Sequence, residues 1–149
     1  MQAEKSAPAP LWTIAVLALA PFPVSSLLYA YGSPALRPGA LTALQLWSAM
    51  VLSFLGGVRW GLESSRAAPR WTRLITSVLS SVAAWALLMS RGHLSASWMI
   101  IGFLAAFMLQ WLFDHTAPDV PARYPRLSTT LTAGACVSLA IALEQALRM

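Results

Sequence analysis

The chain has 149 residues, with ten Lys and Arg, five Asp and Glu, and a formal net charge of +5. Charged residues make up 10% of it and hydrophobic residues 58%, whereas a soluble domain carries about 25% charged residues. A soluble domain of this size cannot cover so much apolar surface, because its surface-to-volume ratio is high. The composition excludes a soluble enzyme, a disordered tail and a secreted disulfide scaffold, and it predicts a membrane protein with several spans.

The excess of positive charge does not indicate a nucleic-acid partner. The arginines fall between apolar runs, where they act as topology determinants and as contacts for anionic lipid. Cys136 is the single cysteine, which excludes a disulfide framework, and His93 and His115 are too few and too far apart for a zinc site. We therefore expect no metal and no cofactor.

A polar lead, residues 1–10, precedes five apolar runs at 11–31, 41–60, 72–90, 97–113 and 127–147. Each run is about long enough to cross a hydrocarbon core of ~30 Å as a helix. The connections between the runs are short, so consecutive helices should be antiparallel neighbours. The sequence thus predicts an all-α membrane protein whose residues 11–149 form one domain, an antiparallel bundle of five transmembrane helices.

Proline and glycine mark the expected ends of the runs. The segment 37–39, Arg-Pro-Gly, predicts a delayed start for the second helix, and Pro69 interrupts the second connection. Prolines 118, 121 and 125 make the fourth connection incompatible with continuous helix. Most tryptophans lie near predicted ends, as is typical of membrane interfaces, and only Trp47 and Trp85 lie deeper.

Pro21 and Pro23 fall near the middle of the first run. Each lacks an N–H group and so frees a helix carbonyl, which a neighbouring group or water must satisfy. We predict a kink there, with a ligand cavity at the kink as an alternative to simple packing. Pro21 would directly follow any cleavage after Ala20, and apolar character continues to Tyr31, so we expect this run to be a retained helix rather than a signal peptide.

The orientation of the bundle follows from counting basic residues on each side. With five spans, one side holds seven of them: Lys5, Arg59, Arg66, Arg70, Arg73, Arg123 and Arg126. The other side holds three, Arg37, Arg91 and Arg148. The count predicts the N-terminus inside, the C-terminus outside, and contact between the inner arginine cluster and anionic lipid. Abundant Ala and Arg are typical of a GC-rich bacterial genome and favour a bacterial inner membrane; in a mitochondrion the equivalent inside is the matrix.

Two charged residues end the second and fourth runs on the same predicted side, Arg59 and Asp114. An unpaired ion at the edge of hydrocarbon is costly, so we predict that they pair, with Gln110 and Tyr124 as further partners. A structural ion pair is one interpretation. Another is a pocket for an anion or a lipid headgroup that also uses Trp60, Arg123 and Arg126. A catalytic Asp114 is the least supported, because no second carboxylate or metal ligand is clearly placed beside it.

Small residues follow the same two runs at helical spacing, and small residues let membrane helices approach closely. We expect helix packing at five of them: Ser53, Gly56, Gly57, Gly102 and Ala106.

The segment 52–61, Leu-Ser-Phe-Leu-Gly-Gly-Val-Arg-Trp-Gly, resembles the signature of a family of small membrane proteins. This is the family called domain of unknown function 3429, or transmembrane protein 69-like. Weaker similar patches lie at Pro21-Phe22, at Ser80-Ser81-Val82 with Trp85, and at Tyr124, Leu127 and Leu131-Thr132. Family members tend to carry Arg where this chain has Ser128. The resemblance implies the same helical fold and a role for Gly56, Gly57, Arg59 and Trp60, and it names no reaction.

Two functions remain open from the sequence. The first is a non-enzymatic scaffold, accessory or assembly protein of an energy-transducing membrane, which packs its helices against a partner or a second copy. The second is a small-molecule or lipid binder or carrier with a pocket near Arg59 and the Pro21–Pro23 kink. The translocator proteins, five-helix and rich in Trp, are similar to this chain in scale. A binder should have a cavity lined by Trp47, Trp85 or Gln45.

Overall fold

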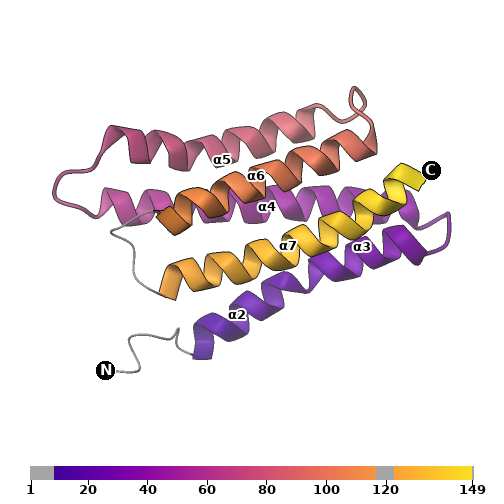
Figure 1. Cartoon of the computed structure of the whole chain (residues 1–149), viewed down its shortest axis with the longest axis horizontal. Coiled ribbons are helices and arrows are strands. Elements are labelled where there is room, and N and C mark those ends of the chain that lie inside the picture. The colour runs from indigo at the N-terminus through magenta and orange to yellow at the C-terminus, as the bar shows by residue number, and fades with distance from the viewer. Residues whose placement is uncertain (1–8, 117–122, 149) are drawn as a thin grey trace.

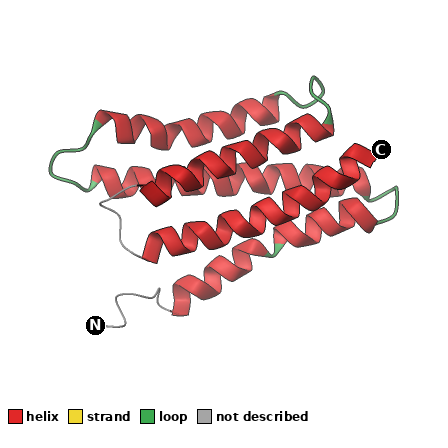
Figure 2. Ribbon diagram, viewed as in Figure 1, coloured by secondary structure: helices red, strands yellow, loops and turns green. Residues whose placement is uncertain are grey.

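The computed structural model describes the backbone of residues 9–116 and 123–148, and the side chains there except those at 9, 11, 114–116 and 123–128. In these ranges the chain is helical apart from short connections, and no strand is present (Figures 1 and 2). The helices are α2 (Ala9–Leu19), α3 (Pro21–Tyr31), α4 (Arg37–Ser64), α5 (Trp71–Met89), α6 (Ala96–Thr116) and α7 (Arg123–Arg148).

Within the described ranges, five segments are long and apolar enough to cross a membrane. They are Trp12–Tyr31, Arg37–Ser64, Trp71–Met89, Ala96–Phe113 and Thr129–Arg148. The first consists of most of α2 together with α3, and each of the others belongs to one helix. The prediction of an all-helical membrane protein with five spans is therefore confirmed.

The helix α4 is longer than the sequence predicted, and it begins at Arg37 instead of residue 41. Pro38 lies in its first turn, where the missing N–H group has no helical partner to lose and the fixed φ angle suits a helix. For the same reason α7 begins at Arg123 and includes Pro125. The expectation that these prolines lie outside the helices is wrong. With 28 residues, α4 is about 42 Å long, more than a hydrocarbon core requires.

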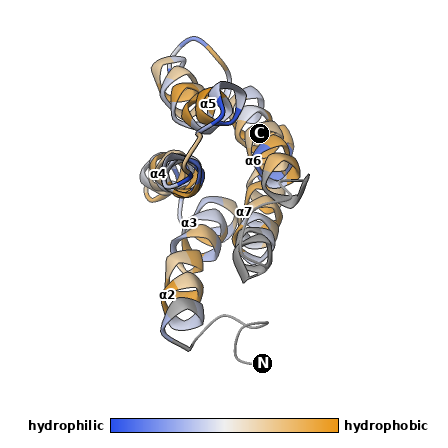
Figure 3. Cartoon of the chain, turned by 90° about the vertical axis from the view of Figure 1, so that its left-hand side faces the viewer, coloured by the Kyte–Doolittle hydropathy of each residue, from blue (hydrophilic) through white to orange (hydrophobic). Residues whose placement is uncertain are grey.

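The helix pairs run back and forth along one long axis, so the N-terminal end of α2 and the C-terminal end of α7 lie at opposite ends of Figure 1. The helix α4 packs against α3, α5 and α6, and α7 packs against α6, α3 and α2. Figure 3 shows α5 and α2 at opposite margins of the molecule, with α3 between α4 and α7. The loops 65–70 and 32–36 lie at opposite ends of α4.

The centre of the molecule is aromatic and is contributed mainly by α3 and α6. Phe22 and Phe107 are fully buried and meet edge to face, with ring centroids 6.0 Å apart and planes at 78°. Phe103, Ile100 and Leu139 are also fully buried in this cluster. Because lipid tails are as apolar as these side chains, close packing rather than removal from water favours this interior.

The helices α4 and α5 approach each other closely at Gly56. A Cβ atom on Gly56 would overlap the backbone oxygen of Ser77 and lie 3.0 Å from Cβ of Ser80. Glycine is therefore required by the contact between these two helices, as is typical of small residues at membrane helix interfaces.

The other four residues predicted to pack between helices differ in their burial and in the contacts they make. A Cβ atom on Gly102 would overlap Cδ2 of Leu87, so α6 also approaches α5 closely. Ala106 is half-buried and packs against the core, and Ser53 is half-buried. Gly57 is exposed, and a Cβ atom there would meet nothing within 4 Å. Gly57 therefore makes no helix contact among the described residues, because it lies on the face of α4 that points away from them.

Replacing Gly56 with alanine should lower stability by about 1–3 kcal/mol, the typical result of forcing a methyl group into a tight contact. Gly57→Ala is the matched control, because the same methyl group enters open space; it should leave stability unchanged or raise it by up to about 1 kcal/mol, the helix-propensity gain of alanine over glycine. Unfolding midpoints of the purified variants in detergent measure both effects. Equal midpoints for the two variants would contradict the α4–α5 contact.

Candidate functional site

The buried charge nearest the middle of α4 is Arg59, which is only 5% exposed. The helix continues to Ser64, so Arg59 does not end it as the sequence predicted. A single glycine such as Gly61 does not break a helix when tertiary contacts bury the residues that follow. The Arg59 guanidinium carbon lies 5.6 Å from the ring centroid of Phe113, in the last turns of α6. This distance is typical of a cation–π contact.

A layer of polar side chains lies on the neighbouring helices next to Gly56. Gln110 on α6 is 2% exposed, and its Oε1 accepts a hydrogen bond from Oγ of Ser80 on α5. Ser77, one turn earlier on α5, is buried and donates to the carbonyl oxygen of Leu74 at 2.6 Å. The Ser80–Gln110 bond thus joins α5 to α6, as side-chain hydrogen bonds commonly do in membranes, whereas Ser77 bonds back to its own helix.

The predicted partners of Arg59 are only partly described. Asp114 follows Phe113 in α6 and Tyr124 lies in the first turn of α7, but both side chains lie outside the described residues. The Arg59–Asp114 ion pair therefore stays a prediction, and the contact of Arg59 with Phe113 brings α4 to the residue before Asp114. Trp60 is 46% exposed and points away from this layer.

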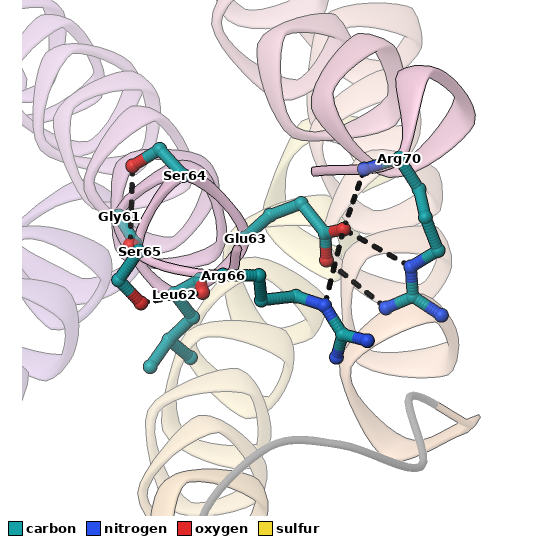
Figure 4. Close-up of polar contacts among 7 residues, drawn as sticks. All are labelled: Gly61, Leu62, Glu63, Ser64, Ser65, Arg66 and Arg70. Carbon is teal, nitrogen blue, oxygen red and sulfur yellow. Dashed lines mark hydrogen bonds and ion pairs between the residues drawn. The ribbon is translucent and has the colours of Figure 1, made fainter. Parts of the chain in front are cut away.

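A second charged group lies one turn beyond Arg59. The carboxylate of Glu63 is 6% exposed, and Figure 4 shows Arg66 and Arg70 both reaching it. Its Oε1 accepts hydrogen bonds from the backbone N–H of Arg70 at 2.8 Å and from Arg70 Nε at 3.0 Å. Its Oε2 accepts from Arg70 Nη2 at 3.0 Å, and Arg66 Nε lies 3.7 Å from Oε1. Because Arg70 immediately precedes α5, Glu63 caps this helix and joins α4 to it.

Glu63 was not predicted as a site residue, although two signals in the sequence point to it. It is the only acidic residue between positions 5 and 113, in a segment that holds Arg59, Arg66, Arg70 and Arg73. It also extends the helical spacing of Gly56 and Arg59 by one more turn. Because the helix was predicted to end at residue 60, Glu63 was not counted as part of this spacing.

The first span is interrupted at Ala20, between Leu19 and Pro21. Ala20 keeps helical angles (φ −55°, ψ −41°), so the interruption arises from the missing N–H groups of Pro21 and Pro23 and not from a reversal of the backbone. The carbonyl oxygen of Ala18 accepts a hydrogen bond of 2.9 Å from the indole Nε1 of Trp47 on α4. A side chain of the neighbouring helix thus supplies a donor at the interruption.

Three residues would line a cavity if the protein were a small-molecule binder, but the structure places them in other surroundings. Trp47 contacts the interruption of the first span. Gln45 is 3% exposed and its Nε2 donates to Sδ of Met99 at 3.7 Å. Trp85 is 63% exposed on α5 and faces outward. Among the described residues, no three His, Cys, Asp or Glu side chains are grouped as a metal site requires.

Comparison with known proteins places this arrangement in a family. The family model described as Protein of unknown function (DUF3429) matches residues 7–144. The chain belongs to this family. The resemblance noted in the segment 52–61 is therefore confirmed, and the match includes Pro21, Arg59, Glu63 and Asp114.

A relative of this DUF3429 protein is Transmembrane protein 69 of Xenopus tropicalis. It is 31% identical over 142 residues, which cover 93% of this chain and 55% of the relative. The chain thus spans about half the length of that relative. No solved structure gives a significant match.

The predicted ion pair can be measured by a double-mutant cycle. If Arg59 and Asp114 pair, Arg59→Ala and Asp114→Ala should each lower stability, and the double variant should lose less than the sum. The coupling energy expected for residues in contact is about 0.5–3 kcal/mol, read from unfolding in detergent. Arg59→Ala combined with Glu144→Ala is the control, because Glu144 lies near the other end of the helices. Additive effects in both cycles would show that Arg59 and Asp114 do not interact.

Proposed function

We propose that this chain is a non-enzymatic accessory or assembly protein of the bacterial inner membrane, which acts by packing its helices against a partner membrane protein. The observation that carries the proposal is that the interior is occupied by the chain's own large side chains. Phe22, Phe103, Phe107, Leu44 and Leu52 are at most 1% exposed and belong to one cluster.

Three of the polar groups that could recognise a small molecule are used within the chain. Gln110 binds Ser80, Gln45 binds Met99, and Trp47 binds the Ala18 carbonyl at the interruption of the first span. A carrier would keep such groups for its ligand, because a ligand pocket needs a few well-placed polar groups directed into it. These contacts favour the accessory function over the translocator-like alternative.

The outward face of α4 offers a surface for a partner helix. Met50, Phe54, Gly57 and Gly61 follow one another at spacings of three and four residues, and all four are exposed. A Cβ atom on either glycine would meet nothing within 4 Å. Two glycines four residues apart on an apolar face let another membrane helix approach closely. We infer that the partner packs here.

The proposed orientation places the N-terminus in the cytoplasm, in one antiparallel bundle. Arg59, Arg66, Arg70 and Arg73 lie toward the end of the molecule that also holds the start of α2, whereas Arg91 lies toward the other. The excess of basic residues on one side supports that side as the inner one. Since a bacterial inner membrane is energy-transducing, the partner is expected in an energy-converting complex.

The accessory function predicts a defined neighbour on α4. A photo-crosslinking amino acid at Gly57 or Gly61 should give one discrete crosslinked product in native membranes, which mass spectrometry of the protein purified in mild detergent identifies as a stoichiometric partner. The same amino acid at Val82, which is 49% exposed on α5, is the matched control and should label mainly lipid.

A protein that purifies alone and gives the same labelling at Gly57 and Val82 would contradict the accessory function. If that protein also retains a lipid or a pigment, the result favours the binder, with Arg59 and the Pro21–Pro23 segment as the region to test. A crosslink to a second copy would assign the α4 face to self-association.

The orientation has its own measurement. In a Cys136→Ala background, Ser65→Cys in the loop after α4 should react with a membrane-impermeant maleimide only after the inner face is opened. Ser95→Cys, in the loop before α6, should react from outside. Both positions are exposed, so accessibility reports the side of the membrane. The reverse pattern would overturn the orientation.

A further inference from the structure

A serine in the interior part of α4 carries a hydroxyl group without a hydrogen-bond partner. Ser48 is 0% exposed, and its Oγ makes no hydrogen bond among the described residues. It lies about 16 Å from the start of α4 and further from its end, so the hydroxyl cannot reach the polar surface of a bilayer. A polar group buried in this way is costly unless a partner satisfies it.

Other serines of the chain show what such a hydroxyl ordinarily does. Ser26 donates to the carbonyl oxygen of Pro23 at 3.3 Å, and Ser77 donates to that of Leu74 at 2.6 Å. Bonding back to a carbonyl of the same helix is the usual solution for a hydroxyl in a membrane helix. Ser48 does not use the carbonyl of its own helix in this way, so its hydroxyl is directed toward another partner.

An amide group lies one turn away on the same face of α4. Gln45 precedes Ser48 by three residues, and residues at this spacing are neighbours on a helix, with Cβ atoms about 5–6 Å apart. Gln45 is 3% exposed, and its Nε2 donates to Sδ of Met99 at 3.7 Å. A thioether sulfur is a weak acceptor, and an amide nitrogen carries two N–H donors. Gln45 therefore keeps the capacity for a second and stronger hydrogen bond.

We propose that Gln45 and Ser48 bind one water molecule inside the membrane-spanning part of the protein. The water accepts a hydrogen bond from the Gln45 amide and shares another with the Ser48 hydroxyl. The carbonyl oxygen of Leu44 completes the site, because a carbonyl has a second lone pair beyond the one used in its helix. A buried water makes about three hydrogen bonds, and these three groups supply them.

The neighbouring side chains restrict the site to a molecule of this size. Leu44 and Leu52, one turn to either side of Ser48, are 0% and 1% exposed and belong to the central apolar cluster. A lipid or a larger polar molecule would have to displace them. Water bound to buried polar groups is a regular part of protein interiors, whereas an apolar cavity stays dry. The inference is independent of the accessory function, because that function uses the exposed Gly57–Gly61 face.

Solid-state NMR of the ¹³C-labelled wild-type chain in lipid bilayers tests the site by transfer of proton polarisation from water to side-chain carbons. The Cβ signal of Ser48 should rise early, at a rate close to that of Ser65, which is exposed. Ser77 is the internal control, because it is 1% exposed and bonds to its own helix, so its signal should rise later. Equal rates for Ser48 and Ser77, or polarisation that reaches Ser48 first from lipid acyl chains, would overturn the proposal.

Gln45→Met tests the pairing of the amide with the hydroxyl. It removes the amide and keeps an unbranched side chain, so the water should be lost and the Ser48 signal should rise as late as that of Ser77. Leu46→Met is the matched control: it places the same side chain at the next position, which is 44% exposed, and should leave the Ser48 signal unchanged. An early Ser48 signal in Gln45→Met would contradict a water shared by the two residues.

The stability of Ser48→Ala gives a second answer through the sign of the change. If the hydroxyl has no partner at all, its removal relieves the cost of burying it. If it shares a water with Gln45, its removal leaves the amide without that water and lowers the unfolding midpoint in detergent. Ser53→Ala, at a half-buried position of the same helix, is the control for the greater helix propensity of alanine.

The midpoint of Ser48→Ala should lie below that of Ser53→Ala, and a midpoint above it would overturn the proposal. If Ser48→Ala does not fold, the Ser48 signal of the wild-type chain decides, because that measurement needs no variant. Neither measurement needs a partner protein, so failure of the water site is distinct from failure of the crosslink at Gly57.

Discussion

The hydrocarbon of a bilayer offers no hydrogen-bond partner, and the rest of this structure depends on that constraint. Every span is helical because a helix satisfies its own backbone groups. Pro21 and Pro23 lack the N–H groups that would bond the carbonyls of Leu17 and Leu19 in a continuous helix, and the Leu17 carbonyl accepts from the N–H of Ala20 instead, at 3.2 Å. At the same interruption the indole of Trp47 donates to the neighbouring Ala18 carbonyl, and this bond ties the first span to α4.

The helix α4 organises its neighbours through three residues on successive turns of one face. Gly56 lets α5 approach, Arg59 lies against Phe113 of α6, and Glu63 caps the start of α5. Polar groups inside a membrane are costly unless they are satisfied, and this face of α4 satisfies its own by contact with neighbouring helices. The extra length of α4 allows the third of these contacts, because Glu63 lies beyond the span that the sequence predicted.

Because these interior groups contact neighbouring helices, we expect molecules larger than water to bind on the outer surface of the protein. The deep amide groups of Gln45 and Gln110 are engaged within the chain, so such molecules are expected to bind at the helix ends and on the lipid-facing surface. The partner is assigned to the Gly57–Gly61 face of α4, which is exposed and leaves room for another helix.

The number of spans, the helical class and the family could be predicted from the sequence, because length, hydropathy and a short motif are local properties of the chain. The inward positions of Trp47 and Gln45 and the outward position of Trp85 could not. A membrane helix that is apolar on all sides carries little periodic signal to show which face its neighbours cover. Only the tertiary structure decided this, since the face of each residue depends on which helices pack around it. Glu63 was missed for a different reason: the helix was predicted to end at residue 60, and the contact of Glu63 with Arg70 forms across the turn that follows α4.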